Sequence, residues 1–482
     1  MQRPGRGATA LPLGQAQALT YAPGMADDKI PTSRIRRLSK IGGVAASTTA
    51  RQLGTRAANV GRSDEAGQKA MERRQLQTAE QIVAVLGTMK GAAMKLGQVM
   101  SFLDVGLVPE EFRDEFQAKL AELRDAAPNV AFKDMKKVIE QEYGEPIEEV
   151  FESFDPVPIA AASIGQVYRA HLSDGRAVAV KVQYPGVAAA VRADMQNLAV
   201  ILRLMKRVAP GLDAKALGTE VRERIEEELD YELEASNQRR LARIYRGHPF
   251  IVVPEVVGSL SRERVVVSEF VDGRGFEEMK QLDQAERDRI GEIIFRFYFG
   301  CMYRHHQFSG DPHPGNCMLL GDGRMAFLDF GLFKTISNDV AEFELAAQRL
   351  ATERRAGELV AHMHEHGWIT DPSHYPEEKA LAMVDDMTWW YTQDREIQLD
   401  PEIATDVLIQ MGDPRSRHFG TMRHETMPPD HLFGRRLEVL TLAVISQLRS
   451  RANWHRIARE WMYGEDPVTE LGRQEAAFFE PR

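Results

Sequence analysis

Hydrophobic residues early in the chain recur in steps of three and four, which is the spacing of one buried face of an α-helix. The longest such stripe runs from residue 82 to residue 103. A second helix is predicted to begin at Pro109, and a third is predicted at 132–143, where Gly144 favours a helix end. The segment 76–150 is therefore predicted to be a helical extension.

Beyond residue 151 apolar and polar positions alternate, which is the pattern of half-buried β-strands. Residues 167–172 and 177–182 follow this alternation, and Gly175 between them favours a tight hairpin turn. The other elements predicted in this part are strands at 251–253 and 265–270 and a charged helix near 220–240.

Strands come first and helices follow beyond residue 273, which is the order of an α+β fold with a small β-rich lobe before a larger helical lobe. No internal repeat is visible. The predicted division is a disordered extension at 1–30, a basic Gly/Ala/Arg-rich arm at 31–75, the helical extension at 76–150, a β-rich lobe at 151–272 and a helical lobe at 273–482.

The charge balance is acidic overall but uneven. The 482 residues carry a formal net charge of −10, which argues against a nucleic-acid partner because that would need a basic surface. Residues 29–62 contain no acid and eight Lys or Arg side chains. Such a block can attract an anionic membrane surface, and a solvated arm is the equal alternative.

Cysteine content and hydropathy predict a cytoplasmic protein, with any membrane contact peripheral at the inner face. The two cysteines, Cys301 and Cys317, are too few for a disulfide framework. No run of 18 apolar residues occurs, so no transmembrane helix is expected. The first 24 residues lack the apolar core of a signal peptide, and Met25 could be the native start.

The most informative chemistry lies in two short segments. Asp311-Pro312-His313-Pro314-Gly315-Asn316 places an Asn five residues after an Asp, and Asp329-Phe330-Gly331 follows soon after. This is the spacing of a kinase catalytic loop and its metal-binding triplet. Asp311 is predicted to orient or deprotonate the nucleophile, and Asn316 and Asp329 to hold Mg2+ on the phosphates of ATP or ADP.

Lys181 ends an alternating strand, Val178-Ala179-Val180-Lys181, similar to the strand that carries the phosphate-contacting lysine of kinases. One hairpin earlier lies a candidate phosphate loop where a kinase would have glycines. The alternatives are an ordinary edge strand and a small-residue turn without a ligand. The loop residues are Ala160, Ala161, Ala162 and Ser163, followed by Ile164 and Gly165.

A run of acids at 228–234 is predicted to lie on one helix, with residues 227, 230, 231 and 234 on one face and Glu228 off it. A run of this kind usually forms a solvated helix surface. Because Lys181 requires a carboxylate partner, a specific role for at least one of these acids is predicted. Lys95 and Gln98 interrupt the buried stripe with two polar groups on one face.

Histidines provide weaker signals. The run His362-Met363-His364-Glu365-His366 lacks a metal-binding spacing, so a metal site is not predicted there. His313 could orient Asp311 or serve only in packing.

Together these residues resemble the UbiB family of atypical kinase-like proteins, which is associated with isoprenoid quinone biosynthesis. The resemblance covers about residues 30–460. It is carried by the following motifs: Lys95-Leu96-Gly97-Gln98, the Ala160–Ser163 loop, Lys181, the acidic stretch at 228–234, the 311–316 segment and Asp329-Phe330-Gly331.

The resemblance implies a protein-kinase-like two-lobed fold whose helical extension covers the active site and excludes protein substrates. Glu234 would pair with Lys181. Glu228 and Asp230 would meet the gating residues Lys95 and Gln98. The remaining implied contacts are those of adenine with Glu269, Phe270 and Val271 in a hinge at 268–273.

The implied activity is ATP hydrolysis or phosphorylation of a small molecule or lipid, with a lipid or quinone precursor as ligand. The absence of an Ala-Pro-Glu triplet and long activation segment after Gly331 agrees with this. Many bacterial members end in two transmembrane helices, whereas residues 437–482 are amphipathic and charged. A conventional small-molecule phosphotransferase and a nucleotide-binding pseudoenzyme scaffold stay open as alternatives, and so does a homodimer.

Overall fold

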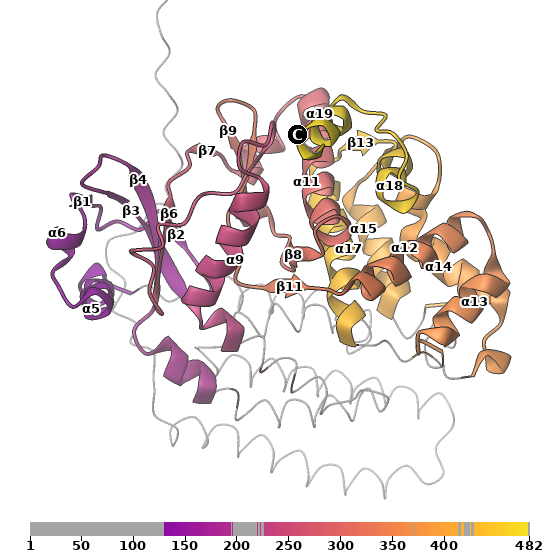
Figure 1. The fold of residues 1–482 in the computed structure, drawn as a ribbon, viewed down its shortest axis with the longest axis horizontal. Coiled ribbons are helices and arrows are strands. Elements are labelled where there is room, and N and C mark those ends of the chain that lie inside the picture. Colours follow the sequence, from indigo (N-terminus) through magenta and orange to yellow (C-terminus); the bar gives the residue numbers. More distant parts are fainter. Residues whose placement is uncertain are drawn as a thin grey trace, which may run out of the picture.

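The computed structural model describes residues 130–480, apart from 194, 196–218, 220–221, 223–225, 370, 413–415, 419–424 and 426–428. The predictions made for the basic arm, for the helices before residue 130 and for Lys95 and Gln98 lie outside the described residues. The α+β fold with two lobes is confirmed (Figure 1).

The small lobe is built on an antiparallel sheet in the order β1-β3-β4-β6, with β2 paired to β3. The predicted hairpin is present, and Gly175 at its turn has a φ of 85°, which suits a residue without Cβ. Val178, Val180 and Val182 point into the core, and Lys181 between them therefore lies on the other face. The strands are β1 (Ser153–Phe154), β2 (Ala160–Ala161), β3 (Gly165–His171), β4 (Ala177–Gln183) and β6 (Val265–Glu269).

Helix α5 (Phe132–Tyr143) packs against β4 and ends at Gly144, as the sequence predicts. Gly144 has a φ of 75° and its N–H donates to Glu140 O, which closes the last turn. The short helix α6 (Ile147–Val150) follows. Both helices lie at the outer end of the small lobe (Figure 1).

Helix α9 (Tyr231–Ile244) lies between the sheet and the large lobe (Figure 1). The prediction of one continuous helix through 228–234 is wrong, because the helical residues 226–228 end in a turn at Leu229. Asp230 then caps the new helix by accepting the N–H of Leu233 at 2.9 Å. Glu228 and Glu234 therefore belong to different helical segments.

A second sheet joins the lobes in the order β5-β10-β9-β7. The predicted strand at 251–253 exists as β5 (Ile251–Val252), and it pairs in parallel with β10 of this second sheet. The other strands here are β7 (Gly273–Arg274), β9 (Cys317–Leu320), β10 (Met325–Phe327) and the separate pair β8 (Gln307–Ser309) and β11 (Phe333–Thr335).

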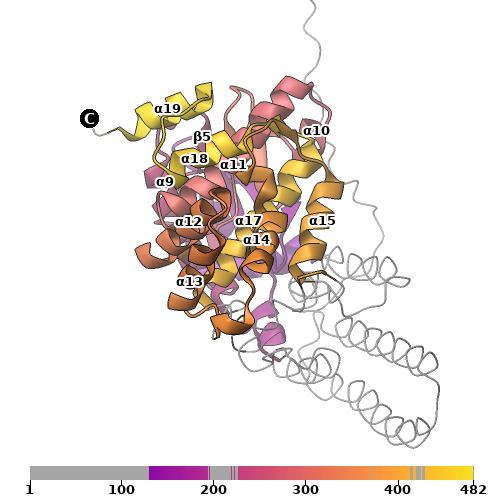
Figure 2. The same cartoon turned by 90° about the vertical axis from the view of Figure 1, so that its right-hand side faces the viewer.

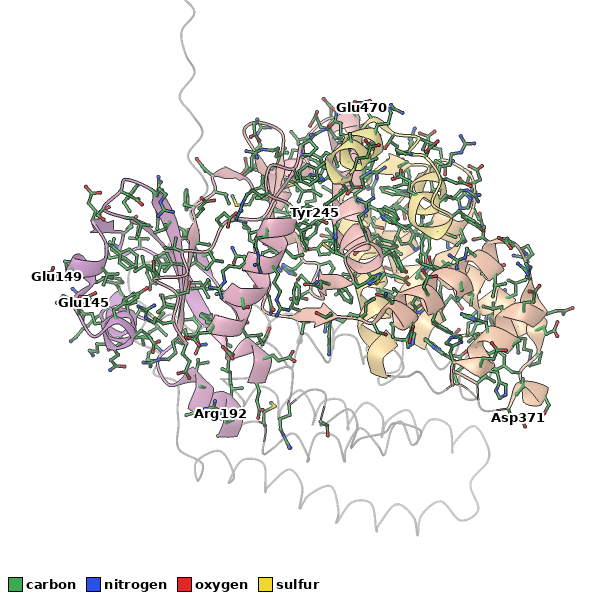
Figure 3. All side chains as sticks on the ribbon, viewed as in Figure 1. Glu145, Glu149, Arg192, Tyr245, Asp371 and Glu470 are labelled. Carbon is green, nitrogen blue, oxygen red and sulfur yellow. The ribbon has the colours of Figure 1, made fainter. Side chains whose placement is uncertain are left out.

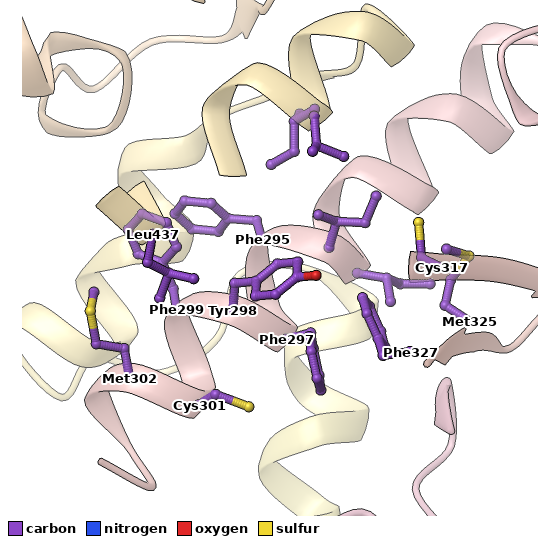
Figure 4. Close-up of a cluster of buried hydrophobic side chains, with 14 of the residues drawn as sticks. Phe295, Phe297, Tyr298, Phe299, Cys301, Met302, Cys317, Met325, Phe327 and Leu437 are labelled. Atoms are coloured by element: carbon purple, nitrogen blue, oxygen red, sulfur yellow. The ribbon is translucent and has the colours of Figure 1, made fainter. Parts of the chain in front are cut away.

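The large lobe is organised around helix α11 (Gln284–Tyr303), whose second half is buried on all sides (Figure 4). Phe297 stacks on Phe327 of β10 with ring centroids 3.7 Å apart, so this core also supports the hairpin of β9 and β10. Such all-round burial is typical of a central helix.

The other helices of the large lobe pack around α11 or, like α13 (Ala356–Glu365), against its neighbours (Figure 2). Among the described residues no helix is both long and apolar enough to cross a bilayer. The helices are α10 (Phe276–Met279), α12 (Asn338–Thr352), α13 (Ala356–Glu365), α14 (Glu377–Thr392), α15 (Pro401–Gly412), α17 (Pro429–Leu448), α18 (Trp454–Met462) and α19 (Glu470–Phe479).

Contacts at the end of α9 connect the two lobes. Tyr245 directly follows α9 and lies against the large lobe (Figure 3). Its ring centroid is 5.6 Å from that of Phe297 in α11 and 6.0 Å from that of Phe479 in α19. The helix that carries Glu234 is thus held by aromatic packing at its far end.

Candidate active site

Lys181 lies between two carboxylates that come from distant parts of the chain. Its Nζ is 2.6 Å from Oε1 of Glu234 and 3.3 Å from Oδ2 of Asp329. The Lys181 side chain is 18% exposed, so the cation is partly buried and still open to a ligand. The structure thus brings together the lysine, the helix acid and the acid of the Asp329-Phe330-Gly331 triplet.

The first turn of α9 positions Glu234 beneath Lys181. Gln183, at the end of β4, donates to Leu229 O at 2.8 Å and so ties the start of α9 to the sheet. Asn237, one turn beyond Glu234, donates to Phe330 O at 3.4 Å. These contacts make α9 a bridge between the strand of Lys181 and the segment of Asp329.

Burial and charge act against each other in this group. Burial raises the pKa of Glu234 to about 7, although the neighbouring Lys181 lowers it. Burial by itself would lower the pKa of Lys181, but Asp329 and Glu234 raise it well above its usual value. Lys181 therefore stays cationic and available to an anionic ligand, and Glu234 is the member of the pair that can take up a proton near neutral pH.

Tyr231 is a member of this group that sequence reasoning missed. The Lys181 ammonium lies 5.2 Å from the centre of the Tyr231 ring, and the ring is buried. This is within the range of a cation–π contact. An aromatic residue in an acidic stretch carries no sequence signal for such a role.

Asn316 and Asp329 are brought together by the hairpin of β9 and β10. Cys317 pairs with Phe327 in this hairpin, so Asn316 and Leu328 flank the pair, and Leu328 N–H donates to Asn316 O at 2.9 Å. Asp329 follows at once, and its Oδ1 accepts the N–H of Gly331 at 3.1 Å. One strand pairing therefore sets the spacing of both candidate metal ligands.

Asp311 lies five residues before Asn316 in a loop with its own internal hydrogen bonds. Asn316 Nδ2 donates to Asp311 O at 3.2 Å, and His313 Nδ1 accepts the N–H of Gly315 at 3.0 Å. His313 thus shapes the turn through a backbone hydrogen bond. Arg436 in α17 also reaches this loop, with its Nη2 3.3 Å from Asp311 Oδ1. Sequence reasoning missed Arg436, because an Arg 125 residues away carries no local signal.

The alanine-rich loop is a β-hairpin rather than an isolated turn. Ala160 and Ala161 form β2, and Ala162 N–H donates to Gly165 O at 2.8 Å across the turn that contains Ser163. Ala160 pairs with Val167, which in turn pairs with Lys181. Because residues opposite each other point to the same face, the Ala160 methyl group lies on the face of Lys181.

Glycine is required at position 165, where the start of β3 lies close to the backbone of β4. A Cβ at this position would lie 2.3 Å from Val182 O and 2.9 Å from the hydroxyl of Tyr231. Only glycine permits such a close approach of two backbones. The hairpin is consequently packed tightly against the start of α9.

The predicted hinge follows β6. Glu269 is its last strand residue, and Phe270 N–H donates to Ala177 O at 3.0 Å, so this backbone is tied to β4. The Arg169 guanidinium lies 4.6 Å from the centre of the Phe270 ring. Adenine contacts by Glu269, Phe270 and Val271 stay a prediction.

The predicted gate is described only on one side. Glu228 precedes the turn at Leu229, and Asp230 caps α9. Lys95 and Gln98, their expected partners, lie outside the described residues, so this part of the prediction is untested.

The oxygen donors present would fit Mg2+. Asp329 supplies a carboxylate and Asn316 an amide oxygen, which are ligands that Mg2+ accepts. No cluster of three or more His, Cys, Asp or Glu side chains suited to a metal occurs within the described ranges. Mg2+ at nucleotide sites is usually held by one or two carboxylates together with phosphates and water, so a larger protein cluster is not needed.

Comparisons with known proteins agree with this geometry. Residues 122–353 match the model of the ABC1 atypical kinase-like domain. The chain is 30% identical over 374 residues to the "Atypical kinase coq-8, mitochondrial" of Caenorhabditis elegans, covering 75% of this chain and 48% of that protein. It is 30% identical over 337 residues to the "Atypical kinase COQ8B, mitochondrial" of Rattus norvegicus, covering 67% of this chain and 61% of that protein.

A solved structure extends the likeness over most of the chain. Rv3197 of Mycobacterium tuberculosis, solved in complex with erythromycin, is 32% identical with a TM-score of 0.58. The match covers 83% of this chain and 98% of that one. By contrast, the chain spans only about half to three fifths of the curated relatives above. On these likenesses, the chain belongs to the UbiB family of ABC1 atypical kinase-like proteins.

Proposed function

We propose that this chain binds ATP or ADP together with Mg2+ and either hydrolyses ATP or transfers its terminal phosphate to a small molecule or lipid. The observation that carries this proposal is the position of Lys181, whose ammonium contacts both Glu234 and Asp329. A cation held beside the acid of a metal-binding triplet is the arrangement that kinases use to orient phosphates.

Each side chain of the site would have a separate role in phosphoryl transfer. Lys181 would contact phosphate oxygens, with Glu234 holding its ammonium in place. Asn316 and Asp329 would hold Mg2+, which offsets the negative charge of the phosphates when it is bound. Asp311 would accept the proton of the attacking hydroxyl or water. The oxygen of that hydroxyl or water would bond to the terminal phosphorus as ADP leaves. Transfer to an alcohol would then yield its phosphate ester, ADP and a proton.

The ligand class is proposed from the family. Its association with isoprenoid quinones, together with relatives named as COQ8 kinases, supports a lipid or quinone-precursor ligand. The basic segment 29–62 would serve peripheral contact with anionic lipid, and a homodimer is compatible with the proposal. They are proposals for the whole protein, because the chain spans only about half to three fifths of the length of these relatives.

Nucleotide binding is tested by thermal unfolding with ATP or ADP, with and without Mg2+. Wild-type protein should be stabilised by about 2.7 kcal/mol at a ligand concentration of one hundred times Kd. Asp329→Asn should lose the Mg2+-dependent part. Asp322→Asn is the matched control, because Asp322 lies in the exposed turn of the same hairpin and pairs with Arg324. Equal stabilisation of Asp329→Asn and wild type would refute the metal assignment.

Turnover separates an enzyme from a scaffold. Phosphate release should rise when anionic liposomes or phenolic quinone precursors are added, if the proposed ligand class is correct. Nucleotide binding without phosphate release or transfer under these conditions would favour the pseudoenzyme, and stoichiometric phosphorylation of a soluble alcohol would favour a conventional phosphotransferase.

A further inference from the structure

Helix α17 brings an arginine to the candidate catalytic base. Arg436 Nη2 lies 3.3 Å from Asp311 Oδ1, and the two side chains are 18% and 17% exposed. An ion pair that is mostly shielded from solvent is screened less by salt than a surface pair. The contact joins the catalytic loop to a helix that the kinase motifs do not include.

The neighbouring residue explains why α17 can hold this arginine in place. Arg435 faces the core of the large lobe, where its Nη2 is 2.7 Å from Glu344 Oε2 and its Nη1 is 3.3 Å from Glu438 Oε2. Successive residues of a helix point about 100° apart. Arg435 therefore anchors α17 to the core while Arg436 points to Asp311.

The anchor is itself closely packed. Glu438 Oε1 accepts hydrogen bonds from Tyr303 of α11 at 2.9 Å and from Gln348 of α12 at 3.0 Å. Glu344, also in α12, is 2.8 Å from the Nδ1 of His431 at the start of α17. Three helices thus share one buried polar network, in which a rotation of α17 would leave charged groups without partners. The direction of Arg436 is set by this network.

We propose that Arg436 is a positioning residue for phosphoryl transfer, which holds one carboxylate oxygen of Asp311 and so fixes the orientation in which Asp311 takes the proton of the acceptor. This role rests on the proposed function. Arg suits it because its planar guanidinium keeps a defined direction when it donates to a carboxylate, whereas the ammonium of Lys is a point charge. The proton passes from the acceptor hydroxyl to Asp311 and the phosphate passes from ATP to the acceptor oxygen, so no other reactant is needed.

The test compares Arg436→Gln, Arg436→Lys and the control Gln447→Ala in full-length protein with Mg2+ and ATP. Gln447 is exposed on the same helix, and its Nε2 donates to Ala443 O one turn earlier. We expect Arg436→Gln to lower kcat by about 10-fold or more, the range of misplaced catalytic groups. KM for ATP and the thermal shift with Mg2+ and ADP should stay unchanged. Arg436→Lys should recover part of kcat, and Gln447→Ala should match wild type.

A double variant separates positioning from a general structural role. If Arg436 acts through Asp311, then Asp311→Asn with Arg436→Gln should be no slower than Asp311→Asn alone. Multiplied losses of kcat, or an unchanged kcat in Arg436→Gln, would overturn the positioning role and leave the proposed function intact. Wild-type protein that shows neither hydrolysis nor transfer would overturn both. If Arg436→Gln does not fold, Arg436→Lys replaces it, alone and in combination with Asp311→Asn.

Discussion

Arg296 and Lys181 are both held among carboxylates, and they differ in how much of each group solvent can reach. Arg296 in α11 is fully buried and contacts Glu292, Glu460 and Glu475. Lys181 contacts Glu234 and Asp329, and the Asp329 side chain is 34% exposed. The Arg296 group is closed to solvent, whereas the Lys181 group is partly exposed.

The hydrogen bonds of Arg296 explain why this cluster leaves no site for a ligand. Its Nε donates to Glu292, its Nη1 to Glu460 and Glu475, and its Nη2 to Glu460 and to the hydroxyl of Thr469. These are all five N–H groups of a guanidinium. The cluster consequently joins α11, α18 and α19 and has no donor left for a ligand.

Gly472 allows the backbone of α19 to pack directly against the Arg296 guanidinium. A Cβ there would lie 2.4 Å from the Nη2 of Arg296, so the backbone of α19 approaches the guanidinium directly. Burial of charge therefore does not by itself indicate a functional site. A site becomes a candidate when some donors or acceptors of the buried group are still reachable.

The largest effect should come from breaking the closed cluster. Arg296→Met leaves buried carboxylates without their cation and should lower the free energy of unfolding by about 3–5 kcal/mol. Urea unfolding followed by circular dichroism measures this loss. Arg456→Met is the control, because Arg456 is exposed and pairs with Asp394 at the surface, where little change is expected. Similar losses in the two variants would show that Arg296 is not a structural centre.

A smaller loss of stability but a complete loss of ligand response should follow from Lys181→Met. The unfolding free energy should fall by about 1–3 kcal/mol, because a hydrogen-bonded charge is removed. The loss of unfolding free energy is limited by Glu234. Burial raises the pKa of Glu234 to about 7, so it can take up a proton when the lysine is gone.

The thermal shift with Mg2+ and ATP is the measurement that separates the two cations. It should disappear in Lys181→Met and persist in Lys379→Met, which changes an exposed lysine of α14. A full shift in Lys181→Met would mean that the open cluster does not contact the nucleotide.

The third effect is absent at pH 7 and appears only on acidification, as a dependence of stability on pH at His248. Burial, followed by the charges of Arg304, His305 and Arg296, lowers the pKa of His248 to about 3. The folded ring therefore stays neutral while the unfolded ring binds a proton below about pH 6.5. The resulting stabilisation is complete above pH 6.5 and is lost as the pH falls, by about 2 kcal/mol at pH 5.

His248→Asn tests this dependence between pH 7 and pH 5. The Asn side chain can still accept the N–H of Ile251, which His248 Nδ1 accepts at 3.1 Å, but it does not titrate. The loss of unfolding free energy with falling pH should become smaller than in wild type. His366→Asn, at an exposed position, should leave it unchanged. An equal or steeper loss in His248→Asn would contradict the assignment.

Local patterns were enough to predict two central strands of the small lobe and the end of one helix. The alternation at 167–172 and 177–182 predicted β3 and β4, and Gly144 predicted the end of α5, because strand period and helix termination depend on near neighbours. The same reasoning failed at 228–234. There the Asp230 side chain starts a new helix, and the Gln183 bond to Leu229 O holds the break from across the sheet.

The sequence by itself determined Asp311, Asn316 and Asp329 as candidate residues, because their spacing is local to one loop and one hairpin. It also determined the faces of the strands, since alternation sets the direction of Lys181. Only the tertiary structure decided that Lys181 lies between Glu234 and Asp329, that β5 joins the second sheet, and that Arg436 reaches Asp311. The physical reason is that these contacts join segments 53 to 148 residues apart, and their geometry depends on how whole helices and sheets pack.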